Sequence, residues 1–197
     1  MSKEHRDAFK VAVEDFRANG YSHERVRNLE RHYGNARTRF RHLDDLYAIA
    51  MQAGGPILEL GSGLSSVVLG LAAEKLGTTV TCWETQETWK ERMEDVLALG
   101  GIETVTIALG ELPDVVRTFK DNFGFALFDG PNYDETFMIR ARALEQVGGW
   151  IKFATVMVDD RGLFAYEREL PLWAEKYDLT LTHPDGVSYA IAKPKGK

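Results

Sequence analysis

The residues best suited to chemistry lie in one short stretch, Ile57-Leu58-Glu59-Leu60-Gly61-Ser62-Gly63-Leu64-Ser65-Ser66. Here an apolar strand leads through an acid and two glycines into the start of an apolar helix. Glycines permit backbone angles barred to other residues and leave room for a ligand beside the main chain. The hydroxyl groups of Ser65 and Ser66 stand at the opening of the helix, where such groups satisfy free backbone N–H groups. The pattern predicts a nucleotide-binding turn.

The acids around this turn indicate which ligand it binds. A dinucleotide fingerprint needs a third glycine where this chain has Ser66, and Glu59 would place a negative charge beside a phosphate. The same carboxylate suits a cationic amino-acid group. Glu84 follows the next apolar segment and lies 21 residues beyond Gly63, which is the spacing of an acid that accepts hydrogen bonds from ribose hydroxyls. The two acids therefore favour a ligand that has both a cation and a ribose.

With these residues, the chain resembles the class I S-adenosylmethionine-dependent methyltransferases, and most closely the catechol-O-methyltransferase-like branch with its small bacterial relatives. The resemblance runs from about Gly54 to Gly162 and rests on three motifs: the acid-x-G-x-G turn, Asp129-Gly130-Pro131 and Val158-Asp159-Asp160. It implies S-adenosylmethionine as the cofactor. The cofactor-binding residues that it implies are Glu59, Gly61, Ser62, Gly63, Ser65, Glu84, Glu111 and Asp129, with Glu59 near the methionine part, Glu84 on the ribose and Glu111 near the base.

The same resemblance implies a second part of the site, which binds the methyl acceptor; we call it the acceptor side. Asp129 and Asp159, at the ends of two predicted strands, are its candidate catalytic residues and would orient the methyl acceptor. Together with Asp160 they could bind a divalent metal, Mg or Mn, which prefer such hard oxygen ligands and would lower the pKa of an acceptor hydroxyl. The alternative is that Asp129 caps a turn and Asp160 caps the next helix.

The base that would take the acceptor's proton is not identified by the sequence. Asn132 stands where the resembling branch has a lysine or histidine, and an amide cannot accept a proton. His32 and His42 lie among arginines, where a histidine is more often a surface residue than a base.

The remaining pattern predicts an α/β fold. Apolar strands alternate with amphipathic helices, which indicates a Rossmann-like, mostly parallel sheet with helices on both faces. The last two strands are too close in sequence for a parallel crossover and must be antiparallel. We expect residues 1–52 to form a helical extension that covers the pocket, and residues 53–197 to form one methyltransferase domain. The seven predicted strands cover residues 57–60, 79–83, 104–108, 125–128, 155–158, 179–183 and 187–192, and the helices cover 3–19, 22–33, 37–52, 65–76, 87–99, 112–121, 134–147 and 164–176.

Composition narrows the class of protein. The chain has 197 residues, a net charge of −6 and one cysteine, so a disulfide framework is excluded. It shows no apolar run long enough to span a membrane and no signal peptide, which predicts a cytoplasmic protein without a membrane partner. Six arginines between His23 and His42 are the only support for nucleic-acid binding, and a solvated helix face explains them better.

The sequence therefore predicts an enzyme that methylates a small molecule on oxygen. Two alternatives stay open: a methyltransferase acting on nitrogen or on nucleic acid, and a catalytically silent protein that binds the cofactor. The sequence is also compatible with a homodimer.

Overall fold

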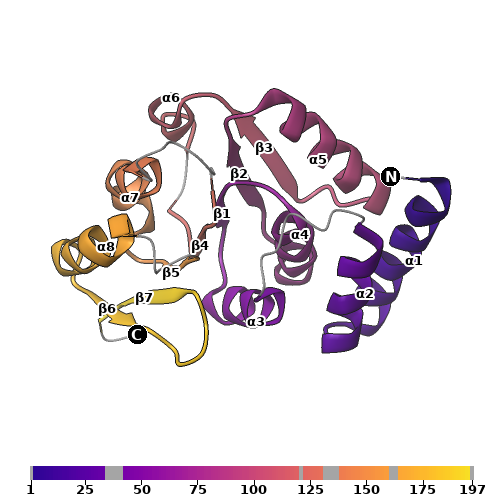
Figure 1. The fold of residues 1–197 in the computed structure, drawn as a ribbon, viewed down its shortest axis with the longest axis horizontal. Coiled ribbons are helices and arrows are strands. Elements are labelled where there is room, and N and C mark those ends of the chain that lie inside the picture. Colours follow the sequence, from indigo (N-terminus) through magenta and orange to yellow (C-terminus); the bar gives the residue numbers. More distant parts are fainter. Residues whose placement is uncertain (1, 34–41, 120–121, 131–137, 160–163, 196–197) are drawn as a thin grey trace.

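The computed structural model describes residues 2–33, 42–119, 122–130, 138–159 and 164–195, and within these ranges it contains one seven-stranded sheet (Figure 1). The strand order is β3-β2-β1-β4-β5-β7-β6. The first five strands are parallel, and β7 runs antiparallel to both β5 and β6. The strands are β1 Ile57–Leu60, β2 Val80–Glu84, β3 Val105–Leu109, β4 Phe125–Phe128, β5 Thr155–Val158, β6 Leu179–Thr182 and β7 Ala190–Pro194.

Helices cover both faces of this sheet (Figure 1). One face packs against α3, α4 and α5, with α1 and α2 outside them, and the other packs against α6, α7 and α8. None of the described helices is long and apolar enough to cross a bilayer. The helices are α1 Lys3–Asn19, α2 His23–Tyr33, α3 Leu43–Ala53, α4 Leu64–Leu76, α5 Glu87–Gly100, α6 Leu112–Val116, α7 Met138–Ile151 and α8 Phe164–Lys176.

Alternation along the strands divides the core into two clusters of buried side chains. Ile57, Cys82 and Met157 belong to the cluster on the α3–α5 face, whereas their neighbours Leu58 and Val158 belong to the cluster on the α6–α8 face. Side chains two residues apart on a strand share a face. Glu59, Glu84 and Asp159 continue the first set, so these three acids point to the α3–α5 side.

The predicted fold class is confirmed, and the first, fourth and fifth predicted strands have the predicted bounds. The antiparallel last pair is also confirmed, although β7 begins at Ala190 instead of residue 187. Within the longer connection, the side chains of Ser188 and Tyr189 bond Asp159 and Asp45, outside the β6–β7 pair.

Two predicted helices also have different ends. Helix α6 stops at Val116, and the hydroxyl of Thr118 donates to the Val115 carbonyl at 2.7 Å, which offers that carbonyl an alternative to a continued helix. Helix α7 instead continues through Gly148 to Ile151. Tyr177 packs where a side chain at Gly148 would lie, since a Cβ there would be 2.5 Å from the Tyr177 hydroxyl oxygen.

Candidate functional site

The candidate site lies at the carboxyl ends of the parallel strands. From the central pair β1 and β4, the chain proceeds outward to β2 and β3 on one side and to β5 on the other, so the strand order reverses between β1 and β4. Open parallel sheets bind ligands at such a point. The predicted turn follows β1 directly, and Asp129 follows β4.

Gly61 fixes how the ends of β1 and β4 meet. Its φ is +92°, and a Cβ there would lie 2.8 Å from the Cα of Gly130. A Cβ on Gly130 would in turn lie 2.7 Å from the Cα of Gly61, so each glycine requires the other. Gly63 differs, because its φ of −178° is extended and a Cβ would meet only the Ser65 hydroxyl oxygen at 3.7 Å. The prediction that both glycines need special angles is confirmed at Gly61 and wrong at Gly63.

Glu59 is fully buried under the turn. Its Oε2 accepts hydrogen bonds from the Ser66 hydroxyl at 2.7 Å and the Cys82 thiol at 2.8 Å. Its Oε1 has no hydrogen-bond partner among the described residues. Burial raises the pKa of Glu59 to about 7, although the Cys82 thiol and the hydroxyl groups of Ser65 and Ser66 oppose that shift. One oxygen of this acid is thus fixed, and the other is left for a further donor.

Ser66 explains why the third glycine of the dinucleotide pattern is missing. Its hydroxyl oxygen accepts a hydrogen bond from the Gly63 N–H at 3.0 Å while the hydroxyl donates to Glu59. The side chain therefore ties the turn to the acid beneath it. Ser65 is also buried in the first turn of α4.

Glu84 at the end of β2 is buried and held by its neighbours in sequence. Its Oε2 accepts from the Ser62 hydroxyl at 2.9 Å, and its Oε1 accepts from the N–H groups of Thr85 and Gln86 at 2.8 and 3.1 Å. The carboxylate is therefore oriented before any ligand arrives. We call Glu59, Ser62, Ser66, Cys82 and Glu84 the β1–β2 cluster.

Two tryptophans brace the loops around this cluster. The indole N–H of Trp89 donates to the Ser62 carbonyl at 2.6 Å, and that of Trp83 donates to the Gly110 carbonyl at 2.8 Å. Trp83 and Leu112 are buried. Glu111 is exposed at the N-cap of α6 and forms no side-chain capping bond.

The acceptor-side acids lie on neighbouring strands. The Asp129 N–H donates to the Leu60 carbonyl at 3.1 Å, and the Asp159 N–H donates to the Phe128 carbonyl at 2.9 Å. Asp159 is buried and Asp129 is half-buried. The structure therefore brings these two predicted residues together beside the turn.

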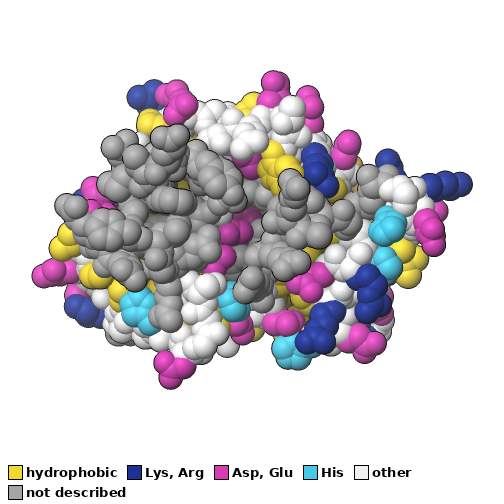
Figure 2. All heavy atoms as spheres, viewed as in Figure 1, with side chains coloured by type: hydrophobic (Ala, Val, Ile, Leu, Met, Phe, Trp, Pro, Cys, Tyr) yellow, Lys and Arg dark blue, Asp and Glu magenta, His cyan; other side chains and the backbone are white. Residues whose placement is uncertain are grey.

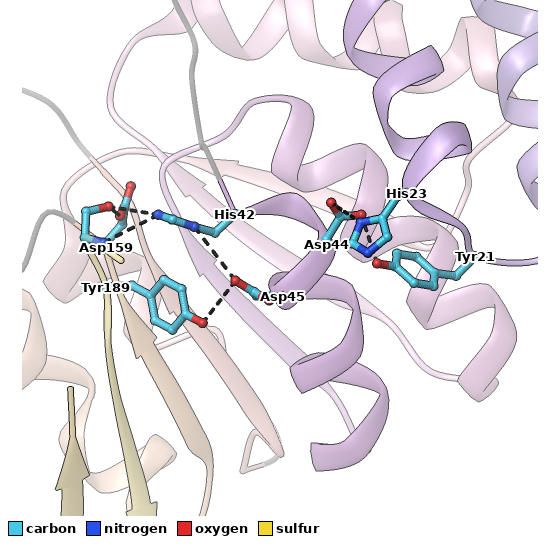
Figure 3. A network of polar contacts seen from close by, with 8 residues as sticks. Tyr21, His23, His42, Asp44, Asp45, Asp159 and Tyr189 are labelled. Atoms are coloured by element: carbon cyan, nitrogen blue, oxygen red, sulfur yellow. Dashed lines mark hydrogen bonds and ion pairs between the residues drawn. The ribbon is translucent and has the colours of Figure 1, made fainter. Parts of the chain in front are cut away.

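A second group of polar side chains surrounds Asp159, and sequence reasoning did not assemble it. The Ser188 hydroxyl donates to Asp159 Oδ1 at 2.9 Å and lies 3.2 Å from Nε2 of His42 (Figure 3). The other ring nitrogen of His42 faces Asp45, which also accepts a hydrogen bond from Tyr189. We call His42, Asp45, Asp159, Ser188 and Tyr189 the β5–α3 cluster. No local sequence pattern predicts this cluster, because its members come from three distant parts of the chain.

The described residues do not assemble a metal centre. No group of three or more His, Cys, Asp or Glu side chains placed to hold a metal occurs in the described ranges, and the predicted ligand Asp160 lies outside them. Oδ1 of Asp159 already accepts the Ser188 hydrogen bond. The prediction of Mg or Mn therefore finds no support in these side chains.

The mixture of acidic and basic side chains differs between regions of the surface. Acidic side chains are visible near the centre of the face in Figure 2, while Lys, Arg and His gather over α1 and α2 together with acidic residues. Two arginines of these helices are paired: Arg17 donates to Glu74 at 2.7 and 2.9 Å, and Arg25 donates to Asp15 at 2.9 Å. Arg25 belongs to the arginine-rich segment between His23 and His42, whereas Arg37, Arg39 and Arg41 of that segment lie outside the described residues, so the solvated helix face stays a prediction.

Comparisons with known proteins bear on the fold. No family model matches the chain, and no curated relative matches it. Solved structures do. A protein from Staphylococcus aureus assigned as a caffeoyl-CoA O-methyltransferase superposes with a TM-score of 0.68 at 15% identity, over 93% of this chain and 97% of that one. An O-methyltransferase from Bacillus cereus in complex with S-adenosylhomocysteine gives 0.67 at 14% identity, over 97% and 100%.

A third similar structure is the O-methyltransferase TomG from Streptomyces achromogenes, in complex with S-adenosylmethionine. It superposes with a TM-score of 0.65 at 18% identity, over 96% of this chain and 90% of that one. At these identities the likeness concerns the backbone. The chain has the Rossmann-like fold of small S-adenosylmethionine-dependent O-methyltransferases, over nearly its whole length.

Proposed function

We propose that this protein is a methyltransferase that moves a methyl group from S-adenosylmethionine to an oxygen of a small molecule. The observation that carries the proposal is the β1–β2 cluster. It presents one buried carboxylate with an unbonded oxygen and one carboxylate held in place at the next strand end, beside a glycine turn. The fold and the neighbours' bound cofactors support the same ligand.

The two acids would divide the ligand between them. Oε1 of Glu59 would accept from the ammonium group of the methionine part, which is the partner that a buried, unpaired carboxylate oxygen lacks. Glu84 would accept from the ribose hydroxyls, and exposed Glu111 would lie toward the base. Backbone from Gly61 to Gly63, with Ser62 and Ser65, would line the ligand where no bulky side chain intervenes.

When bound, the sulfonium cofactor supplies an electrophilic methyl carbon. Catalysis by the protein then consists of alignment and of proton removal from the acceptor. Asp129 follows β4, which pairs with β1, and Asp159 follows β5, which pairs with β4. The two acids would orient the acceptor toward the turn. Helix α3 contacts β5, so the N-terminal helical extension would contribute its His42 end to the acceptor side of the site.

The direct test is turnover by the purified full-length chain. S-adenosylmethionine would be incubated with a panel of catechols, monophenols, hydroxy acids and amines, with EDTA in one arm and Mg or Mn in another, and methylated product and S-adenosylhomocysteine would be measured by mass spectrometry. The proposal expects both products from a hydroxyl acceptor. Cofactor binding without methylation of any acceptor in either arm would instead identify a binding protein.

A further inference from the structure

The β5–α3 cluster contains a candidate for the base that takes the acceptor's proton, which the sequence did not identify. His42 precedes α3 and reaches across to Ser188 and Asp159 at the carboxyl end of β5 (Figure 3). The side chain of His42 is 15% exposed, so the ring is largely enclosed yet accessible. Helix capping does not account for its placement, because it forms no side-chain capping bond to α3.

The neighbours of the ring define its orientation. Nδ1 lies 3.8 Å from Oδ2 of Asp45, and the same oxygen accepts the hydroxyl hydrogen bond of Tyr189 at 3.1 Å. Burial and this hydrogen bond raise the pKa of Tyr189 to about 12, so Tyr189 stays a donor throughout the physiological range. Its ring also packs edge-on against the imidazole, with centroids 4.9 Å apart at 72°.

These contacts favour one tautomer of His42. A carboxylate at Nδ1 stabilises a proton there, which leaves the lone pair on Nε2. Nε2 faces Ser188, whose backbone N–H points to it at 3.5 Å and whose hydroxyl donates to Asp159 at 2.9 Å. The donor to Nε2 is the Ser188 backbone N–H, and because this contact, at 3.5 Å, is longer than the Ser188–Asp159 bond, a stronger donor can displace it.

The position of the ring fits the acceptor side of the proposed site at the strand ends. Asp159 follows β5, which pairs with β4, and β4 pairs with β1 and its turn. Asp159 also points to the α3–α5 face, as Glu59 and Glu84 do. His42 therefore stands at the same edge and on the same face as the proposed cofactor site, on the side away from Glu84.

We propose that His42 is the base that accepts the proton of the acceptor's hydroxyl group. In the step, the O–H proton moves to Nε2 while an oxygen lone pair forms the new O–CH₃ bond. The carbon–sulfur bond breaks, and its electron pair stays on sulfur, which becomes the neutral thioether of S-adenosylhomocysteine. The imidazolium is stabilised by Asp45 and, through Ser188, by Asp159, and then loses its proton to solvent. This assignment rests on the proposed function.

The chain contains a matched control. His23 pairs with Asp44 at 2.7 Å in the same region, but its side chain is 75% exposed (Figure 3). Asp44 also accepts a hydrogen bond from Tyr21, as Asp45 does from Tyr189. The two histidines thus share their kind of partner and differ in their access to the strand ends.

The test compares wild type with His42→Asn and His23→Asn, using the best hydroxyl acceptor of the panel. A positioned base contributes on the order of 10² to 10⁴ in rate, so His42→Asn should lower kcat by about that factor. It should leave the affinity for S-adenosylhomocysteine within about twofold and remove the rise of rate with pH that one ionising group produces. His23→Asn should match wild type. An unchanged kcat and pH profile in His42→Asn would overturn the assignment while leaving the methyltransferase proposal intact.

A second measurement needs no acceptor. In ¹⁵N-histidine-labelled protein loaded with S-adenosylhomocysteine, two-bond ¹H–¹⁵N correlations identify the tautomer of each ring. The assignment expects His42 to carry its neutral-state proton on Nδ1, with an unprotonated Nε2 at mildly alkaline pH. A neutral-state proton on Nε2 overturns it whether or not any acceptor is methylated. Failure to bind S-adenosylhomocysteine at all would instead count against the proposed function.

Discussion

The β1–β2 cluster and the β5–α3 cluster lie at the same edge of one sheet but are built in opposite ways. In the first, the acids are held by groups of one continuous β1–α4–β2 segment: Glu84 by Ser62, Thr85 and Gln86, and Glu59 by Ser66 and Cys82. In the second, Asp159 is held by Ser188, and Ser188 by His42, which is 146 residues away. A turn that assembles itself can bind a constant cofactor, whereas a cluster drawn from distant segments can differ between proteins that share the fold.

The largest effect should come from disturbing the contact on which the first cluster depends. Gly61→Val would force a β-branched residue into a positive φ and against Gly130, at a cost of about 3 kcal/mol or more in the free energy of unfolding. We expect loss of S-adenosylhomocysteine binding by calorimetry and a lower Tm. Gly63→Ala is the control for folding and should retain a Tm near that of wild type, because its backbone is extended. Equal Tm values in the two variants would contradict the close contact between Gly61 and Gly130.

The next effect concerns pH and Glu59. Because its pKa in the folded state, about 7, lies above its unfolded value, its contribution to stability is fully present below the unfolded pKa and is lost as pH rises through 7. Between about pH 5 and pH 8, apo wild type should therefore lose up to about 3 kcal/mol relative to Glu59→Gln in urea unfolding. If the stabilities of wild type and Glu59→Gln changed in parallel with pH, the raised pKa of Glu59 would be contradicted.

The same ionisation should appear in cofactor binding. An ammonium group favours the charged carboxylate, so S-adenosylhomocysteine should bind more tightly as pH rises from about 6 to 8, with release of a proton. Calorimetry in buffers of different ionisation enthalpy measures that proton. The pH dependence should vanish in Glu59→Gln, and its persistence there would assign the proton to another group.

A smaller effect separates the two acids that flank the proposed ribose and base. Glu84→Ala removes an oriented acceptor and should weaken S-adenosylhomocysteine binding by about 2 kcal/mol, roughly thirtyfold. Glu111→Ala removes an exposed side chain and should change the affinity by less than about threefold. Equal losses of affinity in the two variants would contradict the division of roles.

The smallest effect should come from the second cluster. Tyr189→Phe keeps the ring against His42 and removes the hydrogen bond to Asp45, which should cost about 1 kcal/mol in the free energy of unfolding. Cofactor affinity should not change, because Tyr189 lies outside the β1–β2 cluster. A change in cofactor affinity larger than the change in stability would mean that the two clusters are coupled.

The contrast also explains what the sequence could predict. The strand, turn and helix around Glu59, and the position of Glu84, depend on periodicity and short spacings, so they were predicted nearly to the residue. The paired need for glycine at 61 and 130 was invisible, since it comes from two strand ends that meet only in the fold. His42 was judged a surface residue from its arginine neighbours in sequence, but its contacts are set by β5 and by the segment before β7.

The central claim is that the turn after β1 binds a sulfonium nucleoside through two acids. Isothermal titration of the purified chain with S-adenosylmethionine, S-adenosylhomocysteine, NAD and ATP tests it most directly. The account predicts one site for each of the first two ligands and no binding of the other two. Binding of NAD or ATP, with neither sulfur nucleoside bound, would contradict it.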